Sequence, residues 1–238
     1  MDALTSSTAA AAGRADGHAA AEGSKALPAG VRVMQHPLVL HKMSLLRDQR
    51  VLPKQFRELV NELTLLVGTL ATADMDLITT KTLSSPVGTF QGVKLRDTVG
   101  IFPILRAGQG MVDGMLELLP SARVHHLGLY REKSTLLPVE YYNKLPAQCQ
   151  IDLGFVVDPM IATAGTAVAA VNMLKDWGLR RIKFVSVLAS LSGLETLLAA
   201  HPDIEVFVAA VDAELNEHGY IVPGVGDAGD RLFKTFHD

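Results

Sequence analysis

The chain has 238 residues and a mass of 25.5 kDa, enough for one large domain or two small ones with a sizeable buried core. It is 48% hydrophobic, and 22 Lys and Arg residues against 25 Asp and Glu residues leave a net charge of −3, which excludes a strong basic field for nucleic acid. Aromatic residues make up only 5%, which argues against stacking platforms for single-stranded nucleic acid.

The first 29 residues are rich in Ala, Gly, Ser and Thr and offer little surface to bury. We therefore expect a disordered leader, followed by a single folded domain over residues 30–238. A transit peptide is the alternative, but the few basic residues of this segment are outnumbered by acidic ones. The single cysteine, Cys149, excludes a disulfide framework, and no apolar stretch is long enough to cross a membrane, so we expect a cytoplasmic protein.

Two helices are predicted first, over residues 38–48 and 53–70, and Pro53 suits the first turn of the second. Its apolar residues recur at helical spacing and predict a buried face made of Phe56, Leu59, Val60, Leu63, Leu66 and Val67.

Strands and helices then alternate. We predict strands over residues 98–105, 124–129, 153–157, 182–188 and 204–211, with helices over residues 109–119, 166–177 and 194–200. A capping box from Ser192 to Glu195 is expected to begin the last helix. Residues 130–150 are polar and rich in proline and suggest a projecting, mobile hairpin. The alternation predicts a doubly wound α/β fold, with a mostly parallel sheet and ligands at the carboxyl ends of its strands.

The segment FVVDPMIATAGT, residues 155–166, runs from a buried strand through small residues into a helix. Small residues let backbone N–H groups approach a phosphate, and the hydroxyls of Thr163 and Thr166 add donors at a helix N-terminus that favours negative charge. Asp158 is suited to accept hydrogen bonds from sugar hydroxyls. The segment predicts a sugar-phosphate site, with an ordinary threonine-capped turn as the alternative.

Two nucleotide-binding motifs can be tested on the same sequence. The P-loop pattern GxxxxGK[ST] does not occur. Residues 224–229 match GxGxxG by letter, but the nine residues that follow are too few for the rest of a dinucleotide-binding unit. We interpret this segment as a glycine-rich loop suited to recognition through main-chain groups.

Five motifs in this order resemble the uracil phosphoribosyltransferases, which have the type I phosphoribosyltransferase fold. They are HPLV with HKM and LRD (residues 36–48), PILRAG (103–108), YREK (130–133), VDPMIATAGT (157–166) and NEHGYIVPGVGDAGD (216–230). The last motif separates the uracil enzymes from those acting on purines or orotate. The resemblance implies transfer of a phosphoribosyl group from 5-phosphoribosyl 1-diphosphate (PRPP) to N1 of uracil, giving UMP and diphosphate.

The resemblance also implies the site residues. PRPP is expected to bind the loop formed by Asp158, Pro159, Met160, Ile161, Ala162, Thr163, Ala164, Gly165 and Thr166. Arg106 and Arg131 match PRPP-binding positions, and we expect both at the diphosphate, where cationic donors stabilise the leaving group. Uracil is expected at Ile221, Gly226, Asp227 and Ala228, partly through their backbone groups. Asp227 also matches a PRPP contact and, with Arg106, is a candidate catalytic residue that deprotonates or orients the base.

Two positions depart from the wider pattern. Many type I enzymes carry two adjacent acids where this chain has Asp158 and Pro159, so we expect Mg²⁺ to arrive mainly with the diphosphate of PRPP and predict no protein-built metal site. Ala164 stands where glycine is common, and its methyl group suits only a backbone that is not left-handed.

The resemblance further implies at least a homodimer, and a small hood of N-terminal and C-terminal segments over uracil. It leaves open activation by GTP, which some family members show. Two alternatives remain at this point: a transferase for another nucleobase, and a regulator of the same fold that binds RNA and uridine nucleotides. The net charge of −3 and the lack of a clustered basic stripe disfavour the regulator. We expect neither nucleic acid nor a membrane among the partners.

Overall fold

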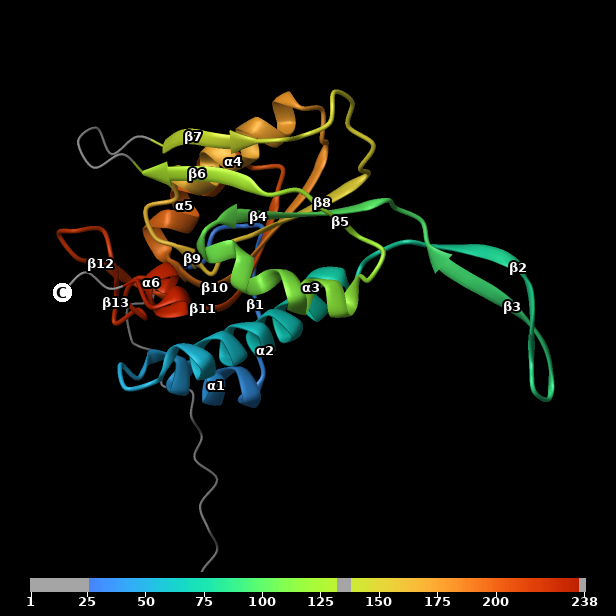
Figure 1. The fold of residues 1–238 in the computed structure, drawn as a ribbon, viewed down its shortest axis with the longest axis horizontal. Helices are drawn as coiled ribbons and strands as arrows, with labels where there is room; N and C mark the ends of the chain where they lie inside the picture. Colours follow the sequence, from blue (N-terminus) through green and yellow to red (C-terminus); the bar gives the residue numbers. More distant parts are fainter. Residues whose placement is uncertain (1–25, 132–137, 236–238) are drawn as a thin grey trace, which may run out of the picture.

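A mixed sheet of nine strands forms the centre of the computed structural model, which describes residues 26–131 and 138–235 (Figure 1). Its main path runs β1-β11-β10-β8-β4-β6-β7, with β5 beside β4 and β9 beside β10. Every pair in it is parallel except β6 with β7. The strands are β1 Val31–Val33, β4 Val99–Leu105, β5 Arg123–Val124, β6 Leu127–Arg131, β7 Pro138–Asn143, β8 Leu153–Val157, β9 Met160–Ile161, β10 Arg181–Ser190 and β11 Glu205–Asp212.

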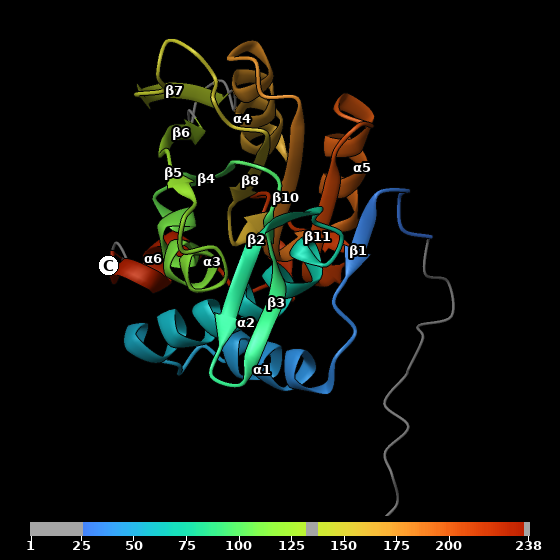
Figure 2. The ribbon, with the colours of Figure 1, turned by 90° about the vertical axis from the view of Figure 1, so that its right-hand side faces the viewer.

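Helices cover both faces of this sheet, which confirms the predicted α/β class (Figures 1 and 2). They are α1 Pro37–Arg47, α2 Pro53–Thr72, α3 Val112–Leu118 with the preceding 3-10 turn η1 Ala107–Met111, α4 Gly165–Asp176, α5 Leu191–Ala200 and α6 Ala228–Phe233. The predicted helices and strands are present, with ends that differ by a few residues, except that the strand predicted over residues 124–129 is two strands, β5 and β6, separated by residues 125–126. Most of the leader expected over residues 1–29 lies outside the described residues.

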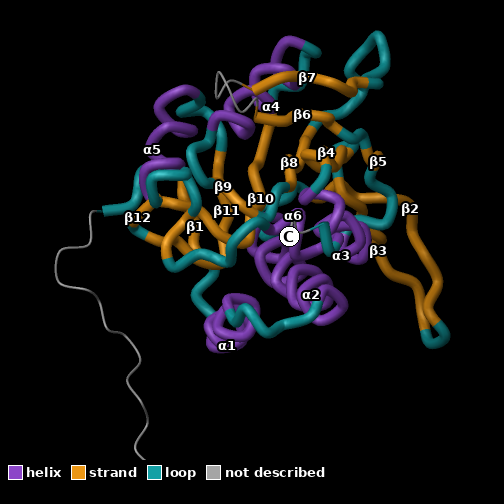
Figure 3. The backbone as a smooth tube through the Cα atoms, turned by 60° about the vertical axis from the view of Figure 1, so that its left-hand side comes forward, coloured by secondary structure: helices purple, strands orange, loops and turns teal. Residues whose placement is uncertain are grey.

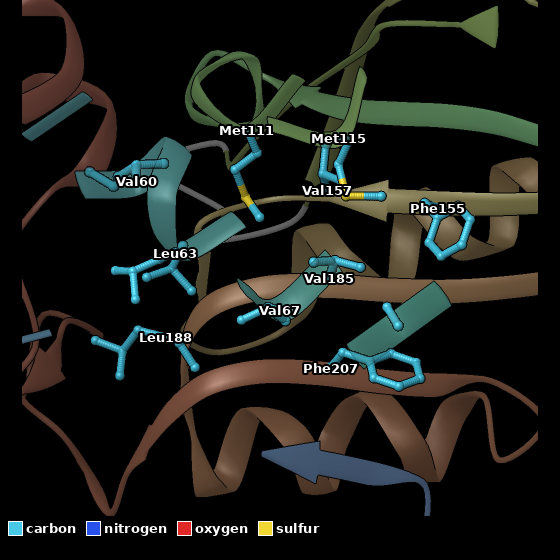
Figure 4. Close-up of a cluster of buried hydrophobic side chains, with 14 of the residues drawn as sticks. Val60, Leu63, Val67, Met111, Met115, Phe155, Val157, Val185, Leu188 and Phe207 are labelled. Atoms are coloured by element: carbon cyan, nitrogen blue, oxygen red, sulfur yellow. The ribbon is translucent and has the colours of Figure 1, made fainter. Parts of the chain in front are cut away.

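The strand β8 shows how the two faces are built. All five of its residues are buried, and successive side chains point to opposite faces of the sheet. Phe155 and Val157 therefore pack in the cluster under α1, α2 and α3, whereas Val156 packs in the cluster under α4 and α5. Figure 4 shows the first cluster, where Leu63 and Val67 of α2 lie near the sheet. The predicted face of α2 is buried there, except that Leu66 is only partly covered.

A long hairpin projects from the sheet where no strands were predicted. It consists of β2 Leu77–Ser85 and β3 Gly88–Leu95 and extends away from the helical layers (Figures 1 and 2). The hairpin expected over residues 130–150 is also present as the antiparallel pair β6 and β7, which forms one edge of the main sheet. Residues 132–137 between these two strands lie outside the described part.

The start of α5 differs from the prediction. The helix begins at Leu191, and its N-cap is Ser190, whose side chain accepts a hydrogen bond from the Gly193 backbone N–H at 2.9 Å. Ser192 therefore does not cap the helix, and the predicted capping box is wrong. Ser190 also donates to the backbone oxygen of Ala162 at 2.6 Å, so the true cap holds the phosphate-loop segment as well as the helix.

Candidate active site

Three of the predicted site residues lie at the carboxyl ends of adjacent parallel strands. Asp158 directly follows β8, Arg106 directly follows β4, and Arg131 is the last residue of β6. The order β8-β4-β6 places the three positions side by side along one edge of the sheet. In an open parallel sheet this edge is where ligands bind. The structure describes the backbone of Arg131 but not its side chain.

Residues 158–166, which we call the phosphate loop, rest on β10. The backbone oxygen of Pro159 accepts hydrogen bonds from the N–H groups of Val187 and Leu188 at 3.2 and 2.9 Å, and β9 pairs with β10. Gly193 is needed beside the loop, because a Cβ atom there would lie 2.2 Å from the backbone oxygen of Ala162. Pro159 and Ala162 of the phosphate loop are thus fixed to β10 and to the start of α5.

The upper end of the phosphate loop is the N-terminus of α4. The N-cap residue, Ala164, has no side-chain acceptor, so the first N–H groups of the helix keep no partner within the helix. A Cβ atom built on Gly165 would meet nothing within 4 Å. The first N–H groups of this twelve-residue helix are unpaired, there is open space over them, and the helix dipole is positive at this end. These three features suit a phosphate group.

The backbone of Ala164 is left-handed, with φ 65° and ψ −2°. We expected alanine here to require a backbone that is not left-handed, and that expectation is wrong. The methyl group is buried, with 4% of the residue exposed, in the cluster under α4 and α5. Burial of this methyl group offsets part of the conformational cost that an alanine meets in this region.

The surroundings of Asp158 raise the pKa of its carboxyl. Burial raises the pKa of its carboxyl to about 7, against an opposing hydrogen bond from the Met160 backbone, and the negative charge of Asp227 raises it further. Part of the residue is nevertheless accessible to solvent. The repulsion between Asp158 and Asp227 means that the structure brings the two predicted acids to the same space, although they are 69 residues apart in the chain.

Arg106 faces an open pocket of about 460 Å³ lined by Leu105, Arg106, Leu129 and Tyr141. Its guanidinium group lies against the C-terminal helix α6. Nη2 donates to Asp230 Oδ1 at 3.0 Å, Nη1 donates to Thr235 Oγ1 at 2.7 Å, and the Thr235 hydroxyl donates to the same Asp230 oxygen at 2.6 Å. About half of the arginine side chain stays exposed, so it remains available to a ligand. The peptide bond between Leu105 and Arg106 is cis.

Residues 221–228, which we call the base loop, connect β13 Ile221–Val222 with α6. Ile221 and Ala228 are buried, so these two residues can reach a ligand only through their backbones. Gly226 has φ 75° and open space around it. Asp227 is the N-cap of α6, and its Oδ1 accepts the Asp230 N–H at 2.9 Å. Gly226 and Asp227 are exposed, and recognition of a base by this loop stays a prediction.

Two arginines hold the base loop against the N-terminal helices. Arg47 forms two 2.7 Å hydrogen bonds with Asp212 and donates to the Gly224 backbone oxygen at 3.0 Å, while the Gly224 N–H donates to Asp212. Arg231, only 8% exposed, donates to the backbone oxygens of Leu46, Asp48 and Val225 at 2.7, 2.7 and 3.0 Å. These contacts join the N-terminal and C-terminal segments that were expected to form a hood, and Figure 3 shows α6 beside α2; that the two segments cover uracil stays a prediction.

The predicted site residues offer two carboxylates, those of Asp158 and Asp227, for a cation. In the described part of the chain no group of three or more His, Cys, Asp or Glu side chains is placed to hold a metal ion. Magnesium commonly binds one or two carboxylates together with substrate phosphates, so this donor set fits an ion that arrives with a diphosphate. Among the described residues, no helix is long and apolar enough to span a membrane.

Sequence reasoning missed the residues that support the site. Arg47 and Asp230 lie in the quoted motifs, but we assigned them no role, and Asp212 and Arg231 were not singled out. The available signal was a charged residue directly beside apolar neighbours, as in LLRD and GDRLF. Such a residue in a buried segment needs a partner, yet the sequence does not identify that partner.

Comparisons with known proteins show the family and the fold of the chain. The family model described as uracil phosphoribosyltransferase matches residues 33–235. A protein of that name from Roseiflexus sp. (strain RS-1) is 53% identical over 207 residues, covering 87% of this chain and 99% of the relative. Another from Pediococcus pentosaceus is 50% identical, covering 85% and 97%. The solved structure of the AQ2163 protein from Aquifex aeolicus matches with a TM-score of 0.81 and 32% identity, covering 86% and 98%.

Proposed function

The chain belongs to the uracil phosphoribosyltransferase family, and we propose that it forms UMP and diphosphate from uracil and PRPP in the site between the phosphate loop, Arg106 and the base loop. It is thus a pentosyltransferase of pyrimidine salvage. The open N-terminus of α4 beside Arg106 and Asp227 carries this proposal. That arrangement offers one place for a phosphate, one for a leaving diphosphate and one for a base.

The phosphate loop binds the 5′-phosphate of PRPP. The N–H groups at the start of α4 donate to its oxygens, and the hydroxyls of Thr163 and Thr166 lie in the same loop. Asp158 accepts hydrogen bonds from the ribose hydroxyls at the neighbouring strand end. These contacts fix the ribose so that its anomeric carbon faces the base, and such positioning supplies a large part of the rate in a displacement reaction.

Arg106 acts at the leaving group. The bond between the anomeric carbon and the diphosphate breaks as the bond to N1 of uracil forms, and negative charge builds on the diphosphate oxygens. A half-exposed guanidinium at the sheet edge stabilises that charge. Arg131, at the end of the neighbouring strand, is the second cationic position. Bound Mg²⁺ would shield the same charge, held by the diphosphate and by the carboxylates of Asp158 and Asp227.

The base loop distinguishes uracil from cytosine. Uracil has an acceptor at O4 and a donor at N3, and cytosine reverses both. Backbone groups near Ile221, Gly226 and Ala228 cannot reverse their polarity, so cytosine would leave buried groups unpaired. Asp227, at the start of α6, orients the base or accepts its N1 proton.

Self-association, location and regulation complete the proposal. We infer at least a homodimer, because the projecting hairpin of β2, β3 and the turn between them exposes Leu77, Leu83, Val87, Phe90, Val93 and Leu95. PRPP is highly charged and cannot cross a membrane unaided, so we place the enzyme in the cytoplasm.

GTP as an activator is tested by rates at subsaturating PRPP with and without GTP, and equal rates would contradict it.

A base panel and one substitution test the reaction and the site separately. With PRPP, the enzyme should use uracil in clear preference to cytosine, orotate and hypoxanthine, and preference for another base would overturn the assigned specificity. Arg106→Ala should lower kcat by about a hundredfold or more, comparable to losing one preorganised donor to a developing charge, with the circular dichroism spectrum unchanged. Turnover close to that of the unmodified enzyme would contradict the role of Arg106.

A further inference from the structure

Asp230 and Thr235 form a closed hydrogen-bonded set with Arg106, and nothing in the reaction described so far uses them. The set joins the end of β4 to α6, which are 124 residues apart at Arg106 and Asp230. Asp230 is mostly covered, with 23% of its side chain exposed. Arg106 is thereby tied to the helix that carries the base loop.

The contact between Arg106 and α6 is close. A Cβ atom on Gly229 would lie 3.3 Å from Arg106 Nη2 and 3.2 Å from Asp227 Oδ1, so the guanidinium packs beside the backbone of the first helical turn. The N–H of Asp230 binds the capping carboxylate of Asp227. One turn of helix therefore connects the predicted base contact, Asp227, with the predicted diphosphate contact, Arg106.

We propose that Asp230, assisted by Thr235, is a positioning residue that couples binding of the base to binding of the diphosphate. This inference rests on the proposed role of Arg106. A guanidinium group has five N–H donors in one plane. Thr235 accepts a hydrogen bond from Nη1 and Asp230 accepts one from Nη2, and these two bonds fix the plane of the guanidinium group. Nε and the remaining hydrogens stay available for diphosphate oxygens.

The coupling follows from this shared helix. Uracil bound at residues 226–228 would contact the first turn of α6, and Asp230 connects the same turn to Arg106, so both ligands favour one position of this turn. Because such coupling is reciprocal, diphosphate bound at Arg106 must strengthen uracil binding by the same factor. Asp230→Asn keeps a similar shape but removes the charge, so the hydrogen bond to the guanidinium is weaker and fixes its orientation less firmly.

A double-mutant cycle tests this inference in the full-length enzyme. Asp230→Asn should lower kcat/KM for PRPP about tenfold in the otherwise unmodified enzyme and have no further effect in the Arg106→Ala background. A comparable loss in both backgrounds, or none in the first, would overturn the inference alone. An Arg106→Ala enzyme with normal turnover would overturn the role of Arg106, and the inference with it.

Binding supplies a readout that is independent of turnover. Titration calorimetry with diphosphate as the probe, with and without uracil, should give tighter binding in the presence of uracil, and Asp230→Asn should abolish that difference. Thr235→Val should weaken the coupling and Thr235→Ser should restore it. Asp203→Asn, which removes a comparable carboxylate from the Lys175 ion pair, is the control and should leave the difference intact. Equal coupling in the Asp230→Asn and unmodified enzymes would overturn the proposal.

Discussion

Asp158 makes the free site sensitive to pH. Its pKa of about 7 lies above the value of 3.8 for an exposed carboxyl, so the folded protein holds a proton that the unfolded chain has lost between these two values. This group therefore lowers stability as pH rises from about 4 to 7, and the full cost remains above pH 7. Since one pKa unit corresponds to about 1.4 kcal/mol, that cost is on the order of 1–4 kcal/mol.

Asp158→Asn should remove this cost. The Tm of the free enzyme should increase at pH 8 and change much less near pH 4, because the folded carboxyl is protonated there and the unfolded one is only partly ionised. PRPP favours the ionised carboxylate, so its KM should rise as pH falls below about 7 in the unmodified enzyme and lose this dependence in the variant. Thermal melts and initial rates between pH 4 and 8 measure both effects. Asp152→Asn, at the other end of β8, is the control, and an equal Tm gain there would refute the assignment.

Ala164 tolerates its left-handed backbone only because its side chain is a single methyl group. In Ala164→Val, the β-branched side chain should lower the free energy of unfolding by about 2 kcal/mol or more and raise the KM for PRPP at least tenfold, as the phosphate loop shifts. Chemical denaturation and PRPP kinetics are the measurements. Ala169→Val, in the right-handed interior of α4, should leave the KM unchanged. A variant at residue 164 with native kinetics would show that the loop geometry does not matter.

At the level of the elements, the helix α6 depends on Arg231. This side chain donates to three backbone oxygens and its guanidinium carbon lies 4.3 Å from the centre of the Phe56 ring. Arg231→Met keeps the packing volume but leaves buried carbonyl groups unpaired, at about 1–3 kcal/mol for such a group. We expect a lower Tm and a KM for uracil that rises more than the KM for PRPP. Arg180→Met, at an exposed arginine, is the control and should change neither.

The elements also show what the sequence can predict. Strands buried on both faces, such as β4 and β8, are continuous apolar runs flanked by polar or charged residues, so both were predicted nearly to the residue. The hairpin of β2 and β3 was missed because most of its side chains are exposed and lack an alternating apolar pattern. The Arg47–Asp212 pair depends on a contact between distant segments, which local patterns do not encode. The Ser190 cap is a local contact, and it was missed because Ser192 offered a second candidate cap two residues later.

For the whole molecule, the projecting hairpin is the prominent exposed apolar surface. Leu77 lies opposite Leu95 and Thr79 opposite Val93, so Leu77, Val93 and Leu95 share one face of the two-stranded ribbon. Val93 alone is 62% exposed. A second copy of this chain could cover that face.

Substituting that face should separate the subunits. The double variant Leu77→Glu, Val93→Glu should sediment and scatter light as a monomer at concentrations where the unmodified enzyme is at least a dimer, since charge would have to be buried at the contact. The circular dichroism spectrum should not change, because exposed positions contribute little to folding. Lys94→Glu, on the opposite face, should leave the mass unchanged. An unaltered mass in the double variant would exclude this face from the interface.

The hood joins the two ends of the domain, and this sets the order in which the site can form during synthesis. Leu46 and Asp48 in the N-terminal part supply backbone oxygens that accept hydrogen bonds from Arg231, 185 and 183 residues further along the chain. The phosphate loop and β8 can fold while this last segment is still absent. A nascent chain should therefore acquire its phosphate site before its base site, and it can recognise uracil only after residues 221–231 have been added.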